Sequence, residues 1–352
     1  MILSPHGGIA WKFFTQGGTL LFESQSPARA LPGGLHLYAN YPQLQIGPLA
    51  FLITQALRVL GPNQGLFATE AILSALGVYL VHAIERIALT VRPGLARQPM
   101  MLRFTFLAGG AVFLVAWVEL AAAFAHLDDA LALALAVLAV RAAVTGHPVS
   151  AGLCIGLGTD AKPWAIAFLP VLLVLPVRAW WRAAAAAAAI VAAAWLPFAI
   201  ADPHSTAALH YTIRNLPGSA LRALGVTDRR TPSWDRTAQL LIGWGLALVA
   251  LWRRRWPAVI LLAVGARIAL DPADHGYYTA GIMVGALLWD ALGSRRPVPL
   301  WSVTSFVALN AIHAVIKNHV LLGQLRLALV LALTAAILLA PARWTWQGDP
   351  GT

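Results

Sequence analysis

The chain has 352 residues, of which 59% are hydrophobic and only 11% are charged, and its formal net charge is +11. A soluble domain carries about 25% charged residues, so this composition excludes an ordinary water-soluble fold. Apolar blocks recur from about residue 66 to 340 between short polar breaks. This pattern predicts an all-α integral membrane protein, a polytopic bundle of about 10–11 transmembrane helices.

The basic excess does not indicate a nucleic-acid partner. Lysine and arginine mark the cytoplasmic loops of membrane proteins, and that bias accounts for the charge. The one cysteine, Cys154, lies in an apolar segment, which excludes a disulfide within the chain and a cysteine-based metal site.

The first 65 residues are predicted to form an external or interfacial segment. Residues 1–45 hold no apolar stretch long enough to span, and 46–60 are short and interrupted by Pro48, Gln55 and Arg58. We therefore interpret 46–60 as an interfacial or re-entrant helix. An external N-terminal segment needs either unaided insertion or a first helix upstream of Met1, and we favour the upstream helix.

The remaining apolar blocks are the predicted spans. Between 148 and 177, Asp160, Lys162 and Pro163 interrupt the run, and because charges are costly in hydrocarbon we interpret it as two short spans. The predicted spans are 66–89, 104–125, 129–146, 148–161, 163–177, 183–201, 237–252, 256–270, 277–292, 298–316 and 320–340.

Alternate breaks differ in charge, which sets the orientation. Arginines gather in the breaks near 86–103, 141, 178–182, 253–255, 295–296 and 343, and these are predicted to be cytoplasmic. The expected protein is a multi-pass protein of the plasma membrane with its active face outside the cytoplasm. It comprises a helical domain over 66–342 with an external loop at 202–236, and a cytoplasmic tail over 343–352.

Polar groups are concentrated in the external breaks, beginning with His126, Asp128 and Asp129. Two carboxylates beside a histidine suit acid–base catalysis or a divalent cation. The alternative is that Asp128 caps a helix beginning at Asp129. No other cofactor is indicated, because the chain has no phosphate-binding loop or nucleotide fingerprint.

The next break contains Lys162 and Trp164. The lysine is suited to a lipid phosphate, and the alternative is a lysine paired with Asp160 beside a tryptophan of the interfacial belt. Further candidates for substrate binding lie in the loop 202–236 and the break 271–278, namely Arg214, Arg236, Asp274, His275, Tyr277 and Tyr278.

Acidic residues also lie inside predicted spans. Glu70 and Glu119 interrupt apolar segments, and an ionisable group at membrane depth indicates function. The alternative is a hydrogen-bonding group between helices.

Two short motifs resemble the glycosyltransferase C superfamily, in particular its bacterial polyprenyl-phosphate-mannose-dependent mannosyltransferases. Tyr41-Pro-Gln-Leu44, followed by a short apolar stretch, is similar to the Tyr-Pro-Pro-Leu that follows the first external loop there. Gly152–Pro170, with Ala-Lys162-Pro-Trp and then Leu-Pro, is similar to a second pattern of that branch. The likeness covers roughly 35–180.

The resemblance implies a membrane enzyme that moves a sugar, such as mannose, from a polyprenyl-phosphate donor to a glycan or glycolipid acceptor. Such enzymes use an acid of the first external loop as base. The position before Trp11, where that acid is expected, holds Ala10, so Asp128 or Asp129 is the expected base. The alternatives are a polytopic transporter or lipid flippase, and a degenerate relative without transferase activity.

Overall fold

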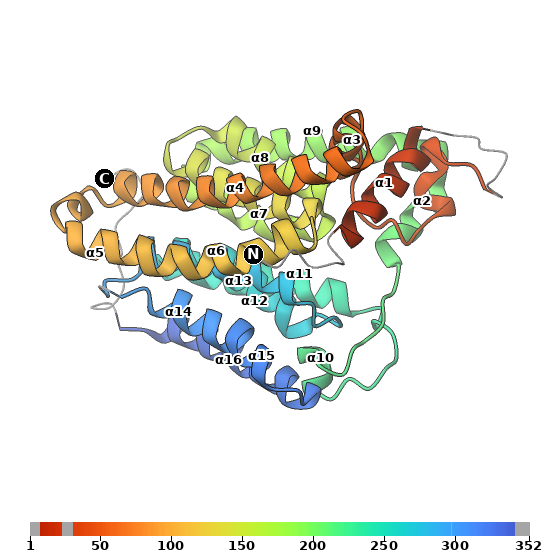
Figure 1. Cartoon of the computed structure of the whole chain (residues 1–352). Helices are drawn as coiled ribbons and strands as arrows, with labels where there is room; N and C mark the ends of the chain where they lie inside the picture. The colour runs from red at the N-terminus through yellow and green to blue at the C-terminus, as the bar shows by residue number, and fades with distance from the viewer. Residues whose placement is uncertain (1–7, 23–30, 297, 342–352) are drawn as a thin grey trace.

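The computed structural model describes residues 8–22, 31–296 and 298–341 (Figure 1). The regular elements of these residues are helices, and an isolated bridge pairs Arg214 with Arg230. The predicted cytoplasmic tail lies outside the described residues, as do parts of the predicted N-terminal segment.

The described residues contain sixteen α-helices, several of them continued by 3-10 or π-helical turns. The N-terminal segment forms α1 (Ile9–Phe22), α2 (Leu37–Asn40) and α3 (Pro48–Arg58). The bundle then comprises α4 (Pro62–Val91), α5 (Pro99–Phe104), α6 (Gly110–Val118), α7 (Leu127–Val144), α8 (Pro148–Ala161), α9 (Val177–Ala201), α10 (Ala220–Ala223), α11 (Asp235–Trp252), α12 (Val259–Leu270), α13 (Thr279–Leu288), α14 (Leu300–Phe306), α15 (Ile312–Val315) and α16 (His319–Leu339).

Each predicted span falls on one of these helices or on a joined run of helical turns. The predicted all-α fold is therefore confirmed. One run differs in type, because Pro163–Val174 forms a 3-10 helix rather than an α-helix. At about 2.0 Å per residue, twelve residues of 3-10 helix extend roughly 24 Å, which is farther than an α-helix with the same number of residues would reach.

Proline sets the beginning of several helices. α3, α4, α5 and α8 all begin on proline, whose fixed φ suits the first helical turn, where its missing N–H is not needed. α4 begins at Pro62, four residues before the predicted start of its span.

In the described part of the chain, four helices are long and apolar enough to cross a membrane, at Pro62–Val91, Pro99–Ala123, Val177–Ala201 and His319–Leu339. Shorter apolar helices lie at Pro163–Val174, Trp256–Leu270 and Leu300–Ala311. α9 is the clearest case, because only 17% of its most apolar window is buried, and Ile200 is 78% exposed. Water would not tolerate so large an apolar face, whereas lipid would. These features indicate a membrane protein.

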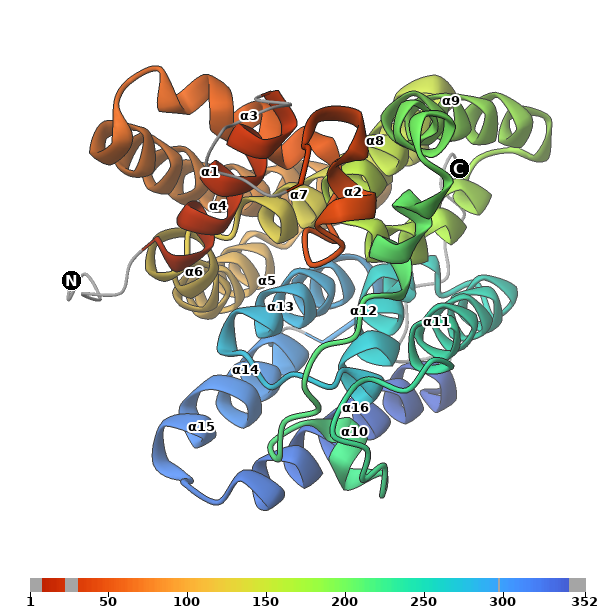
Figure 2. The same ribbon diagram turned by 90° about the vertical axis from the view of Figure 1, so that its right-hand side faces the viewer.

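The helices run lengthwise and pack in two groups around a shared core. In the end view, α4, α7, α8 and α9 lie on one side and α12, α13, α14 and α16 on the other (Figure 2). α8 and α9 pack closely because Gly152 and Gly156 face the alanine-rich stretch of α9. A Cβ on Gly152 would lie 2.0 Å from the carbonyl oxygen of Ala183. The alanine run therefore serves close helix packing, as small residues do in membranes.

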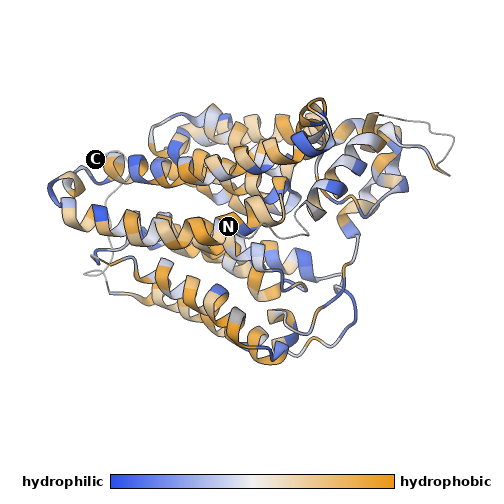
Figure 3. Cartoon of the chain, viewed as in Figure 1, coloured by the Kyte–Doolittle hydropathy of each residue, from blue (hydrophilic) through white to orange (hydrophobic). Residues whose placement is uncertain are grey.

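The two ends of the bundle differ. The turn between α4 and α5 lies at one end, and α1, α2 and α10 lie at the other (Figure 1). Hydrophobic residues dominate the lengths of the helices, and hydrophilic residues gather in the connecting segments (Figure 3). Two arginines of the predicted cytoplasmic breaks bind helix C-termini. Arg92 donates to the carbonyl oxygens of Ala291 and Ser294, and Arg255 to those of Ile337 and Ala340.

The N-terminal segment lies at the end of the bundle opposite the turn between α4 and α5 (Figure 1). α3 has 11 residues and α1 has 14, and neither is among the helices long enough to span. Tyr38 of α2 is buried and stacks on Trp195 of α9, with ring centroids 4.8 Å apart. α2 of the predicted external segment thus packs on α9 of the bundle.

Candidate functional site

The motif around His126 occupies a strained connection between two helices. The π-helical turn Glu119–Ala123 ends the preceding helix, and Ala125 then adopts a φ of 49°. Such a conformation costs a non-glycine residue about 1–3 kcal/mol, and strain of this kind gathers at functional sites. α7 follows, with His126 at its N-cap and both Asp128 and Asp129 in its first turn.

Proline explains the second break. The ring of Pro163 disfavours the α conformation for the residue before it, and Lys162 is extended, with φ −147° and ψ 113°. The chain therefore turns at Lys162, and its Nζ contacts Oδ2 of Asp128 and lies 3.8 Å from Oδ2 of Asp129. Trp164 follows and donates its Nε1–H to Oδ1 of Asp129 at 2.9 Å.

The alternative pairing of Lys162 with Asp160 is not found. Asp160 points the other way and accepts the backbone N–H of Leu49 at 3.3 Å, at the beginning of α3. The close approach is possible because Gly47 has no side chain, since a Cβ there would collide with the backbone of Asp160. Asp160 thus holds the N-terminal segment on α8, and Lys162 is left for the carboxylates of α7.

Asp128 is buried and bound from two sides. His126 Nδ1 lies 2.5 Å from its Oδ1, which also accepts the backbone N–H of Asp129 at 2.8 Å, and Lys162 binds Oδ2. The capping interpretation is wrong, because the N-cap of α7 is His126 and no side chain forms a cap hydrogen bond there. It does not account for the two cations, and the helix begins at Leu127 rather than at Asp129.

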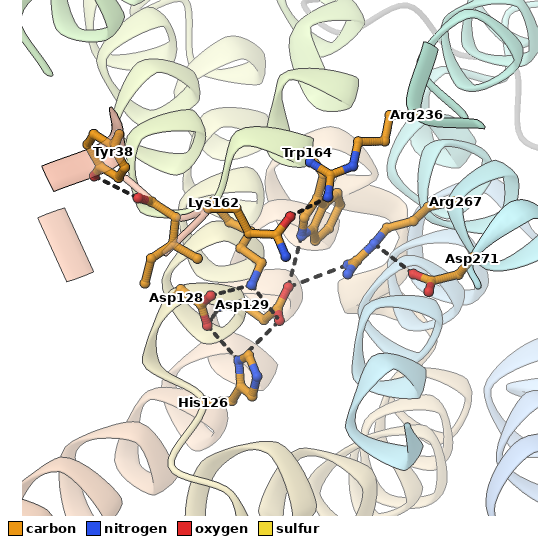
Figure 4. A network of polar contacts seen from close by, with 11 residues as sticks. Tyr38, His126, Asp128, Asp129, Lys162, Trp164, Arg236, Arg267 and Asp271 are labelled. Atoms are coloured by element: carbon orange, nitrogen blue, oxygen red, sulfur yellow. Dashed lines mark hydrogen bonds and ion pairs between the residues drawn. The ribbon is translucent and has the colours of Figure 1, made fainter. Parts of the chain in front are cut away.

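Asp129 is the centre of the cluster. His126 Nδ1 lies 3.1 Å from its Oδ2, and Arg267 Nη1 lies 3.4 Å from its Oδ1. Its Oδ2 is buried and accepts no hydrogen bond of good geometry from the described residues, although Lys162 and His126 lie within ion-pair distance. Figure 4 shows these side chains pointing toward one another from three separate segments.

Arg267 is a site residue that sequence reasoning missed. It lies in α12, inside a predicted span, and its guanidinium carbon is 4.1 Å from the ring centre of Trp164 and 4.6 Å from that of Tyr278. Its Nε lies 3.4 Å from Oδ2 of Asp271, so the group bridges Asp271 and Asp129. The available signal was a charged residue within an apolar span, which indicates a functional or paired group.

Aromatic rings line one side of the cluster. Tyr277 stacks on His126, with ring centroids 4.2 Å apart, and on His275 at 5.3 Å. Phe14 of α1 meets His126 edge-on at 6.0 Å. The break 271–278 therefore reaches the cluster through Tyr277, which stacks on His126, and Tyr278, which lies against Arg267.

Asp274 lies at the edge of this region. Its backbone oxygen accepts a hydrogen bond from Arg326 of α16 at 2.6 Å, and its side chain lies 4.0 Å from His319. It is tied to α16 rather than to the carboxylate pair.

Two predicted arginines of the loop 202–236 have different surroundings. Arg236 donates to the side chain of Gln45 and to the backbone oxygens of Leu209 and Tyr211, so it joins the N-terminal segment to the loop. Figure 4 places it beside Trp164. Arg214 is exposed, and its backbone forms the isolated bridge to Arg230.

The charges of the cluster balance. Burial opposes the charged form of His126, but Asp128 and Asp129 outweigh it and raise its pKa to about 9. Burial likewise opposes the charge on Lys162, and the same carboxylates raise its pKa above the ordinary value. Three carboxylates, those of Asp128, Asp129 and Asp271, thus face protonated His126, Lys162 and Arg267.

The same residues also offer ligand atoms for a metal. One atom each from His126, Asp128 and Asp129 lies within 4.8 Å of the others. Carboxylate oxygens suit magnesium, manganese or calcium. A divalent cation would compete with Lys162 for Asp128, and it would need His126 to lose a proton that both carboxylates stabilise. The donor set is therefore compatible with a cation, and its charge is already compensated without one.

Comparison with known protein families found no match, and comparison with curated proteins found none. The geometry of the cluster is therefore the basis for the function proposed below.

Proposed function

We propose that this protein is a membrane glycosyltransferase that moves a sugar from a polyprenyl-phosphate donor to an acceptor at the non-cytoplasmic side of a plasma membrane. One observation carries the proposal. The breaks at 126–129, 162–164 and 271–278, which are far apart in sequence, meet at one end of the bundle in a single network of ion pairs and stacked rings. Neutral packing would not require so many buried ionisable groups.

Lys162 is proposed to bind the donor phosphate. Its ammonium lies beside both carboxylates, and a cation there would stabilise the charge that develops on a leaving phosphate. His126 and Arg267 lie around the same carboxylates and would add to the positive field. Arg236 is a less direct candidate, because its donors bind Gln45 and the loop backbone.

One carboxylate of the pair is proposed as the base. Binding of phosphate at Lys162 would compete with Asp128 for the ammonium and would release an oxygen able to accept the acceptor's hydroxyl proton. The acceptor oxygen would form its bond to the sugar as the bond from sugar to phosphate breaks. Ala10 lies on α1, whose Phe14 contacts His126, so the expected acid of the first external loop is absent from a helix that lies beside the site.

The rings suit a sugar substrate. Trp164, Tyr277 and Tyr278 present aromatic surface beside the carboxylates, together with polar edges. A divalent cation at His126, Asp128 and Asp129 remains compatible with the proposal.

The proposed topology has ten or eleven spans, with the cluster on the external face.

The proposal is tested with purified protein in liposomes, a radiolabelled polyprenyl-phosphate sugar and a lipid-linked glycan acceptor. We expect labelled product from the wild type, and a chelator arm reports the need for a cation. Labelled donor that crosses the bilayer without forming product would contradict the proposal and indicate a transporter. Donor that binds without transfer or flux would also contradict it, and would indicate a degenerate relative.

A further inference from the structure

Glu119 is an acid in one of the four helices long enough to span a membrane, and the proposed reaction does not use it. It begins the π-helical turn Glu119–Ala123, which leads into the His126 motif. π-Helical turns inside α-helices are rare and are frequent at functional sites. An acid at this depth is costly unless it serves a function or has a partner.

The carboxylate of Glu119 lies directly against the break 271–278. A Cβ added to Gly276 would lie 2.1 Å from Oε1 of Glu119 and 3.0 Å from Oε2. The approach is possible only because residue 276 is glycine. Glu119 therefore sits against the backbone between His275 and Tyr277, on the ring system that reaches the Asp128 pair through His126.

Glu119 differs from the aspartates in its partners. Asp128 and Asp129 are held by cations, whereas the Glu119 carboxylate has no hydrogen bond within 3.5 Å and no ion pair within 4.0 Å among the described residues. Arg326 is the cation whose charge acts on it, and the guanidinium of Arg326 is bound to the backbone oxygen of Asp274. The described residues thus leave the acceptor capacity of Glu119 unused.

Aromatic residues flank both Gly276 and the end of the π-helical turn that Glu119 begins. Phe124, which follows the π-helical turn, lies 4.9 Å from Tyr277, and His275 lies parallel to Tyr277 with an interplanar angle of 8°. His275 is exposed. A saccharide has hydroxyl groups, which can donate hydrogen bonds to a carboxylate. It also has apolar C–H surface, which can pack against an aromatic ring.

We propose that Glu119 binds hydroxyl groups of the acceptor saccharide, and that the turn His275–Tyr277 forms the acceptor subsite. The inference rests on the proposed glycosyl transfer and deepens it. The donor phosphate requires cations and therefore belongs at Lys162, whereas a carboxylate repels phosphate and attracts hydroxyl donors. Tyr277 lies between these two regions, in contact with His126 on one side and with Phe124 and His275 on the other.

The test is a kinetic comparison of Glu119→Gln with a matched control, Glu70→Gln, which changes a half-buried acid in α4. Loss of a hydrogen bond to a charged group costs about 1.5–3 kcal/mol, which corresponds to a rise of about ten- to a hundredfold in KM for the acceptor. We expect the KM for the donor to stay within about twofold of wild type in both variants. An unchanged acceptor KM in Glu119→Gln would overturn the inference.

A second variant acts on the same carboxylate without removing it. Gly276→Ala introduces the methyl group that would collide with Oε1, so Glu119 must move. The acceptor KM should rise here as well, in protein that elutes as a single species in detergent. An equal rise in donor and acceptor KM would indicate general disruption of the site and would contradict the inference.

Direct binding separates this inference from the proposed function. Octyl mannoside serves as the probe, and binding is followed by tryptophan fluorescence in wild type and Glu119→Gln. Binding that weakens about tenfold or more in the variant would support the saccharide subsite even if no transfer is detected. Equal binding in both proteins, or none to the wild type, would overturn the subsite whatever the outcome of the transfer assay.

Discussion

The indole of Trp164 donates a hydrogen bond to Oδ1 of Asp129 over 2.9 Å, although 35 positions separate the two residues. The same carboxylate lies 3.4 Å from Arg267 of α12 and 3.1 Å from His126. The carboxylate of Asp129 therefore joins three segments that are remote in sequence. Removal of one partner from such a buried group leaves the others uncompensated, which makes the cluster sensitive to single substitutions.

Arg267→Lys tests the stacked guanidinium. The variant keeps the positive charge but loses the planar group that lies against Trp164 and Tyr278. We expect the free energy of unfolding to fall by about 1–3 kcal/mol, measured by denaturant titration in detergent. Arg214→Lys, in the exposed loop, is the control and should change stability by less than about 0.5 kcal/mol. Equal stability of the two variants would show that the stacking has no energetic role.

The pKa of His126 predicts how stability depends on pH. In the folded protein this pKa is about 9, above the ordinary 6.5, because Asp128 and Asp129 outweigh the effect of burial. The protonated form therefore stabilises the fold fully below pH 6.5, and the contribution is lost as the pH rises through about 9. This contribution to the free energy of unfolding is on the order of 3 kcal/mol.

The measurement is the melting temperature between pH 6 and pH 10. The wild type should lose stability across this interval, and His126→Gln should lose much less. Parallel curves for the two proteins would contradict the raised pKa.

Asp235 is a buried acid whose charged form the fold disfavours. It lies at the beginning of α11, two residues before the predicted span, and accepts a hydrogen bond from Gln239 at 2.8 Å, whereas its Oδ1 is buried without a partner among the described residues. Burial and then repulsion from Asp271 raise its pKa from 3.8 to about 7. Between pH 3.8 and pH 7 the unfolded chain has released this proton, whereas the folded chain retains it. The residue therefore destabilises the fold increasingly as the pH rises, and this destabilisation reaches its full size above pH 7.

Asp235→Asn removes this penalty, and the amide oxygen of asparagine can still accept from Gln239. We expect the variant to be more stable than the wild type by about 2–4 kcal/mol at pH 8 and equal to it near pH 4. Asp228→Asn, an exposed change, is the control. A loss of stability at pH 8 would show that the ionised form of Asp235 is the one the fold needs.

The helices were predictable because apolar blocks and polar breaks alternate plainly along the chain. The meeting of Asp128 and Lys162 was anticipated only in part, since the sequence assigned both to one face but left open a pairing of Lys162 with Asp160. Arg267 was not identified, because Trp164, Tyr278 and Asp129 lie on other segments, and of its partners only Asp271 is near it in sequence. Contacts of this kind depend on how helices pack side by side, which a linear pattern does not encode.

The orientation of the bundle is tested by cysteine labelling. On a Cys154→Ser background, Asp228→Cys in the loop 202–236 and Arg253→Cys between α11 and α12 are both exposed positions. A membrane-impermeant thiol reagent should label residue 228 in intact cells and residue 253 only after permeabilisation, because arginine-rich breaks remain in the cytoplasm. Labelling of residue 253 in intact cells would invert the predicted topology.

The central claim is that the cluster around Lys162 carries out sugar transfer, and the most direct test is the initial transfer rate of Lys162→Gln. Lys12→Gln is the matched control, since Lys12 is an exposed lysine on α1. The account predicts that Lys162→Gln loses transfer by about a hundredfold or more, as expected when a group that stabilises the leaving phosphate is removed, while Lys12→Gln retains the wild-type rate. A Lys162→Gln protein that transfers sugar at the wild-type rate would show that the reaction takes place elsewhere.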